Sequence, residues 1–127
     1  MARVVAGVLC ALVLAGCNRA DDYLEVVRQQ QATWEETTKL LAGVTDAESM
    51  EAAKDRFAEL TVRAQGSARK AAAMGRPPDA VLEQLEEQRR GLQSAANRMR
   101  AEVARVRQLP GGAEFLKDIE EIARGSR

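Results

Sequence analysis

Two stretches of the chain, each about 30 residues long, carry apolar residues at alternating spacings of three and four, and a pair of prolines separates them. In an α-helix this spacing places the side chains on one face. Pro77 and Pro78 cannot continue a helix, although Pro78 is well suited to the first turn of a new one. The sequence therefore predicts two long helices, at about 46–74 and 78–108, joined by a tight turn.

The apolar positions of these two segments form the pattern of a coiled-coil seam. In the first segment they are Met50, Ala53, Phe57, Leu60, Ala64, Ser67, Ala71 and Met74, and in the second Leu82, Leu85, Arg89, Leu92, Ala96, Met99, Val103 and Val106. When the chain is folded back at the prolines, large residues mostly meet small ones, as in Phe57 opposite Ala96. We therefore expect the two helices to pack against each other as an antiparallel hairpin.

Polar residues within this pattern have predicted roles of their own. Thr45 is expected to cap the first long helix, and Glu48, three residues later, is expected to complete a capping box. Arg89 interrupts the second stripe. We expect it to lie along the surface with its guanidinium in water, and an ion pair with Glu25 is the alternative.

One helix is predicted before this hairpin and one after it. Residues 21–42 carry a mixed stripe of Leu24, Val27, Gln31, Trp34, Thr38 and Leu41, and residues 113–123 place Phe115, Leu116, Ile119 and Ile122 on one side. Trp34 is expected to be a core residue, with stacking on a ligand as the alternative. The last helix must cover its apolar face on its own bundle or on a partner.

The composition agrees with a helical protein, because 46% of the residues are hydrophobic but only 3% are aromatic. Small and unbranched apolar residues favour closely packed helices over sheets. The expected fold is all-α: an antiparallel bundle of three long helices, at about 21–42, 46–74 and 78–108, with a short C-terminal fourth helix at about 113–123.

The first 17 residues have the features of an export signal. Arg3 is followed by 12 residues without a polar side chain, at 4–15, and this run is short of the roughly 20 residues that span a bilayer. It ends in Leu14-Ala15-Gly16-Cys17, which resembles the lipobox of bacterial lipoproteins. The resemblance implies that signal peptidase recognises Leu14, Ala15 and Gly16, that residues 1–16 are removed, and that the sulfur of Cys17 carries lipid.

We therefore expect a lipidated tether at 17–20 and a single helical-bundle domain at 21–127, since the 111 residues that remain have room for one core. Ordinary secretion and a short uncleaved anchor are the alternatives, and both also export the domain. By the same resemblance, Asn18 rather than Asp after the lipidated Cys favours the outer membrane in a diderm bacterium. The domain is expected to face the periplasm or the exterior, without a disulfide.

The composition also argues against several classes of function. The 19 basic and 19 acidic residues balance, whereas nucleic-acid binders usually have a basic excess. The chain has no His, which removes the commonest metal ligand and general base. Neighbouring carboxylates such as Glu86 and Glu87 point about 100° apart on a helix, and no phosphate-binding loop or metal-ligand spacing occurs. We expect no enzyme, metal or cofactor.

Two basic groups are candidate contacts with a partner or with the membrane surface. One is Arg69, Lys70 and Arg76, expected near the lipid, where they either attract anionic headgroups or complement a helix dipole. The other is Arg98, Arg100, Arg105 and Arg107, whose side chains point in different directions around their helix.

The function expected from these features is a non-catalytic, membrane-anchored envelope lipoprotein. Its helical bundle is expected to act as an interaction or scaffolding module, toward an unidentified envelope protein or a second copy of itself. The alternative is a small-ligand-binding bundle in which Trp34 and Phe57 line a cavity.

Overall fold

The computed structural model describes the backbone of residues 2–125 and the side chains of residues 20–125. Its elements are α1 (Ala2–Ala42), α2 (Ala47–Met74), α3 (Asp79–Arg107) and α4 (Gly112–Gly125). The prediction of three long helices followed by a short one is confirmed. The bounds of α2, α3 and α4 lie within two residues of those predicted. Helix α1 begins well before residue 21, because the preceding apolar segment contains no proline to interrupt it.

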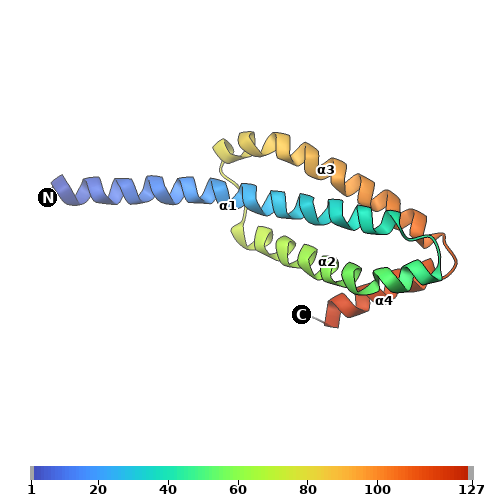
Figure 1. Cartoon of the computed structure of the whole chain (residues 1–127). Helices are drawn as coiled ribbons and strands as arrows, with labels where there is room; N and C mark the ends of the chain where they lie inside the picture. The colour runs from blue at the N-terminus through green and yellow to red at the C-terminus, as the bar shows by residue number, and fades with distance from the viewer. Residues whose placement is uncertain (1, 126–127) are drawn as a thin grey trace.

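Helix α1 lies between α2 and α3 and packs on both of them (Figure 1). Tyr23, near the middle of α1, contacts Met74 at the end of α2, whereas Leu41, at the end of α1, contacts Arg105 near the end of α3. No Cα atom of α2 comes within 8 Å of a Cα atom of α3. The predicted packing of these two helices against each other is therefore not confirmed, because α1 separates them.

The apolar core is divided into two clusters. The distal cluster, at the C-terminal end of α1, contains Leu41, Val44, Met50, Ala53, Phe57, Ala58, Val106, Phe115 and Ile119. The proximal cluster, nearer the N-terminal end of α1, has Tyr23, Val81 and Leu85 as its buried members. The distal end of the bundle therefore has the larger share of the buried apolar side chains.

The buried face of α1 is displaced by about one residue from the predicted stripe. Its buried residues are Tyr23, Val26, Thr33, Thr37 and Leu41, whereas the predicted Trp34 and Thr38 are only half-buried. Two threonines are tolerated here because Thr33 and Thr37 each donate a hydroxyl hydrogen bond of 2.8 Å to the carbonyl oxygen four residues earlier. The prediction that Trp34 is a core residue is wrong, because the buried face of α1 is centred on Thr33 and Thr37 instead.

The N-terminus of α2 is capped one residue later than predicted. Asp46, not Thr45, is the N-cap, and its carboxylate accepts a 2.8 Å hydrogen bond from the backbone N–H of Ser49. The hydroxyl of Ser49 in turn accepts from the N–H of Asp46 at 3.0 Å. A capping box is therefore present, with Ser49 in the place predicted for Glu48.

Helix α4 packs on its own bundle, mainly on α2 and also on α3. The turn before it depends on Gly112, where a Cβ atom would lie 1.8 Å from the carbonyl oxygen of Val106. Phe115, Ile119 and Ala123 are buried on the packed face. The ring of Phe115 meets that of Phe57 edge to face, with centroids 5.8 Å apart. The sequence left open whether this helix packs on its own bundle or on a partner, and in the structure it packs on its own bundle.

Candidate functional site: two cavities between α2 and α3

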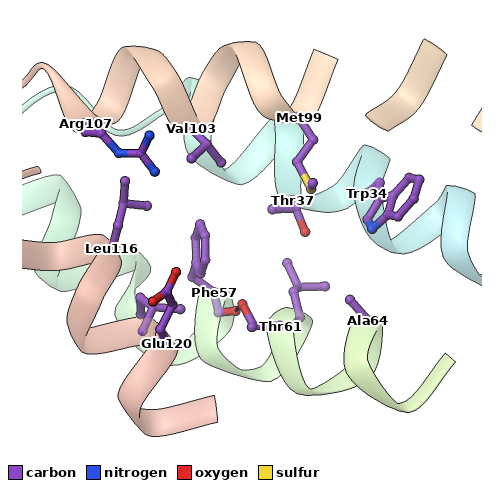
Figure 2. Close-up of a pocket in the computed structure, with 12 residues that line it drawn as sticks. Trp34, Thr37, Phe57, Thr61, Ala64, Met99, Val103, Arg107, Leu116 and Glu120 are labelled. Carbon is purple, nitrogen blue, oxygen red and sulfur yellow. Dashed lines mark hydrogen bonds between the residues drawn. The ribbon is translucent and has the colours of Figure 1, made fainter. Parts of the chain in front are cut away.

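The separation of α2 from α3 leaves a cavity over the C-terminal half of α1. This distal cavity has a volume of about 280 Å³ and receives side chains from all four helices. Its lining residues are Trp34, Thr37, Phe57, Leu60, Thr61, Ala64, Met99, Val103, Arg107, Leu116, Ile119 and Glu120. Figure 2 shows Met99 and Val103 on α3 facing Thr61 and Ala64 on α2 across it. Many of the residues predicted to interdigitate in the seam thus form the walls of a cavity.

The chemistry of the distal cavity suits apolar groups with a limited polar edge. Trp34 and Phe57 offer aromatic surface, and Thr37 and Thr61 contribute methyl groups because the hydroxyl of each donates to the backbone of its own helix. Arg107 and Glu120 are exposed at the edge. No pair of carboxylates lines this cavity, whose lining contains one acid and one base.

A second cavity lies over the N-terminal half of the packed part of α1. This proximal cavity has a volume of about 300 Å³ and lies between the end of α2 and the start of α3. Its lining residues are Tyr23, Val26, Val27, Gln30, Ala71, Gly75, Pro77, Leu82, Leu85 and Arg89. The α1 residues of both cavities recur three and four apart, so the cavities follow the same face of α1.

Tyr23 fixes one wall of the proximal cavity. Its hydroxyl donates a hydrogen bond of 2.7 Å to the carbonyl oxygen of Met74, with a longer approach of 3.3 Å to that of Gly75. These carbonyls belong to the end of α2, where the chain turns through Gly75 at a φ of 72°. A left-handed backbone conformation of this kind favours glycine. The phenol thus ties the α2–α3 turn to α1.

The four arginines of the densest basic group have separate surroundings, as their directions around the helix predict. Arg105 donates hydrogen bonds to the carbonyl oxygens of Leu41 and Val44, at 2.6 and 2.9 Å, and therefore caps the C-terminal end of α1. Arg107 lines the distal cavity. Arg98 lines a separate depression with Glu35, Thr38 and Lys39 of α1, and Arg100 is exposed. They do not form one anion site.

The other basic group, Arg69, Lys70 and Arg76, is exposed at the proximal end of the bundle. Arg76 approaches Asp79 at 4.0 Å. The exposed Asp21 lies two residues before Tyr23, whose contact with Met74 brings the same end of the bundle together. Carboxylates therefore accompany these basic side chains, and the proximal end is of mixed charge.

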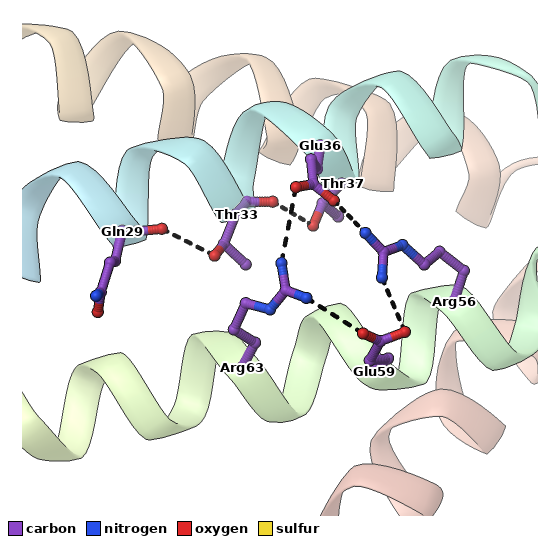
Figure 3. Close-up of polar contacts among 7 residues, drawn as sticks. All are labelled: Gln29, Thr33, Glu36, Thr37, Arg56, Glu59 and Arg63. Atoms are coloured by element: carbon purple, nitrogen blue, oxygen red, sulfur yellow. Dashed lines mark hydrogen bonds and ion pairs between the residues drawn. The ribbon is translucent and has the colours of Figure 1, made fainter.

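A network of ion pairs joins α1 to α2 (Figure 3). Glu59 and Arg63, four residues apart on α2, form an ion pair of 3.2 Å. Arg56 bridges Glu59, at 2.8 Å, and Glu36 on α1. The hydrogen bond and charge of Arg56 lower the pKa of Glu59, and those of Glu59 raise the pKa of Arg56. The network is exposed, so it contributes to the register of the two helices more than to stability.

The candidate residues of the N-terminal signal, Leu14, Ala15, Gly16 and Cys17, lie outside the residues whose side chains the structure describes. None of the described helices combines the length and the apolar character needed to cross a bilayer. Over the same part of the chain, no cluster of three or more acidic or cysteine side chains is placed to hold a metal ion.

Sequence reasoning identified Trp34 and Phe57 as cavity-lining residues only as an alternative, and it missed Gln30, Thr37 and Pro77. The signal that was present is the pair of stripes on α2 and α3, since residues of these stripes contribute to the walls of both cavities. The missing information was that α1 lies between them.

Comparisons with known proteins do not assign this chain to a family: no family model matches it, and no significant match was found among curated proteins or solved structures.

Proposed function

We propose that this protein is a non-catalytic, lipid-anchored module of a bacterial cell envelope, and that it binds a partner through the distal cavity. The anchor follows from the resemblance of Leu14-Ala15-Gly16-Cys17 to a lipobox after an apolar run. The observation that carries the binding role is that α2 and α3 present apolar walls to each other without packing together. An envelope protein that inserts apolar side chains between them would bury this surface.

The binding role is tested by cross-linking in cells. A photo-activated cross-linking amino acid replaces Thr61, which lines the distal cavity, in the anchored full-length chain. The matched control replaces Asp55, which is exposed on the same helix and does not line the cavity. We expect one protein to be captured in stoichiometric amount from position 61 and not from position 55. Equal capture of bystander proteins from both positions would contradict the proposal.

The anchor is tested separately by incorporation of labelled palmitate. The wild-type chain is expected to be labelled, and Cys17→Ser is expected to abolish the label. A wild-type chain without label, or an equally labelled variant, would remove the lipoprotein part of the proposal and leave the binding role untouched.

A small apolar ligand is the second candidate for the distal cavity, and the presence of both Trp34 and Phe57 in its lining favours it. Trp34 is the only Trp in the chain, so its fluorescence reports on this cavity alone. A small-molecule fraction of envelope extract should shift or quench the emission if it contains the ligand. The variant Phe57→Leu removes an aromatic ring from the cavity wall and should reduce the change in Trp34 emission. A change caused only by absorption of light by the extract would be the same in wild type and in the variant.

A further inference from the structure

The proximal cavity differs from the distal one in its charge. Its walls are apolar, and Arg89 is the only ionised side chain in its lining. Five of the lining residues are aliphatic: Val26, Val27, Ala71, Leu82 and Leu85. A volume of about 300 Å³ is at the small end of the range of ligand sites in proteins. The cavity thus offers a small, partly open apolar space with one positive charge at its edge.

Two polar side chains at this cavity have no partner within the part of the chain that the structure describes. Arg89 is exposed and forms neither an ion pair nor a side-chain hydrogen bond there, and the half-buried amide of Gln30 forms no hydrogen bond. They come from different helices, α1 and α3, and line the same cavity. A guanidinium binds a carboxylate or phosphate through parallel N–H donors, and the NH2 group of a glutamine can donate to the same anion.

The turn that lines the proximal cavity favours a thin occupant over a helix. Gly75 and Pro77, in the turn between α2 and α3, also line it, and Figure 1 shows this turn passing across α1 at the proximal end. A partner helix is about 10 Å wide and would meet this turn if it lay along the cavity. An extended hydrocarbon chain does not have this width.

We infer that the proximal cavity binds a single-chain anionic amphiphile, with the hydrocarbon chain between Val26, Leu82 and Leu85 and the acidic head held by Arg89 and Gln30. Burial of the chain supplies the apolar part of the affinity, and the charged head selects acids over neutral amphiphiles of the same length. This inference goes beyond the proposed function, because it concerns the other cavity and holds whether or not Cys17 carries lipid.

The probe is dodecanoic acid carrying a photo-activated diazirine near the end of its chain. It is added to the full-length chain in phosphatidylcholine vesicles, and the labelled residues are mapped by mass spectrometry. We expect saturable labelling of residues that line the proximal cavity, competed by unlabelled dodecanoate and at least about tenfold less well by dodecanol, the size of effect expected for a charge-assisted contact. The Trp34 spectrum is expected to stay unchanged, because Trp34 lines only the distal cavity.

Two variants make the test specific. Arg89→Gln should weaken competition by dodecanoate about tenfold and abolish the preference over dodecanol. Arg90→Gln is the matched control, since Arg90 is the exposed neighbour that does not line the cavity, and it should behave as wild type. Ala71→Phe should block labelling by filling the space. If this variant does not fold, the comparison of Arg89→Gln with Arg90→Gln still tests whether the cavity binds the acidic head.

Labelling that does not saturate, or that is competed equally by dodecanol, would overturn the inference. So would equal affinities of the Arg89 and Arg90 variants. A cross-linker at Leu82 that captures a second copy of the chain despite saturating dodecanoate would assign the surface to self-association instead. None of these results bears on capture from position 61 or on palmitate incorporation, so failure here is distinguishable from failure of the proposed function.

Discussion

The guanidinium of Arg105 donates a 2.6 Å hydrogen bond to the carbonyl oxygen of Leu41, so that the last turns of α3 close the end of α1. The same side chain reaches Val44 and, at 2.8 Å, the carboxylate of Glu102. The last carbonyl groups of a helix have no partner within the helix and carry partial negative charge. The cation of Arg105 therefore adds donors from a different part of the chain to the one backbone N–H, that of Val44, that already reaches Leu41.

Arg105→Gln is expected to lower the free energy of unfolding by about 1.5–3 kcal/mol, the range for hydrogen bonds to charged groups. The carbonyl oxygen of Val44 loses the guanidinium donor, and that of Leu41 keeps only the backbone N–H of Val44. Urea unfolding followed by circular dichroism measures the change. The control is Arg100→Gln, at an exposed position of the same helix, which should stay within about 0.5 kcal/mol of wild type. Equal effects of both variants would show that Arg105 has no special role.

Ile119→Ala is expected to destabilise the protein by about 2–5 kcal/mol, since this side chain is only 1% exposed in the distal cluster. Ile122 offers a matched comparison on the same helix, because it is 42% exposed. The same substitution at Ile122 should have a much smaller effect on the urea midpoint. If the two variants were equally stable, α4 would not pack on α2 as described.

Gly66→Ala is expected to stabilise the protein by about 0.5–1 kcal/mol, because glycine in a helix interior is unfavourable relative to alanine by this amount. A Cβ atom at position 66 meets nothing within 4 Å. At Gly91 the same atom would lie 3.1 Å from the side-chain oxygen of Gln31, so Gly91→Ala should gain less. Thermal unfolding of both variants checks the order, and a loss of stability at position 66 would contradict the open surroundings.

The cap of α2 is expected to weaken in acid. Hydrogen bonds from the backbone N–H and the hydroxyl of Ser49 lower the pKa of Asp46 from its ordinary value. A lowered pKa in the folded state means that the carboxylate stabilises the fold above the pKa of the unfolded chain, and that this contribution is lost as the pH falls through the folded value, from about pH 4 downward.

Asp46→Asn separates capping from titration, since Asn caps helices about as well as Asp. The urea midpoints of wild type and this variant should therefore be compared at pH 6 and at pH 3. Relative to the variant, the wild type should be less stable at pH 3 than it is at pH 6. A difference that is independent of pH would exclude the titration of Asp46 as its cause.

The turns that separate α2, α3 and α4 were predictable because proline and glycine mark them, whereas the start of α1 at Ala2 was not predicted. Pro77 and Pro78 separate α2 from α3, and the segment around Gly111 separates α3 from α4. These residues end or begin a helix through the local conformation of the backbone, so their effect does not depend on how the helices pack against one another. The same holds for the cap of α2, where competition between Thr45 and Asp46 moved the start by only one residue.

The partner of each apolar face was not predictable in the same way. Periodicity shows that Phe57 and Val103 lie on apolar stripes, but it does not say that α1 lies between α2 and α3. The buried face of α1 was misread because Thr33 and Thr37 satisfy their hydroxyl groups on their own helix and can therefore be buried. The two cavities follow from this arrangement, so they could not be derived from the stripes alone.

The division of the core into a large and a small cluster implies that the two ends of the bundle do not share their stability equally. Backbone amides in residues 81–92 of α3 should exchange with deuterium faster than those in residues 95–106, because fewer buried apolar side chains protect them. Local opening would then start at the Tyr23 end, and a protease would cut first near Gly75 while the end that holds Phe115 is still folded.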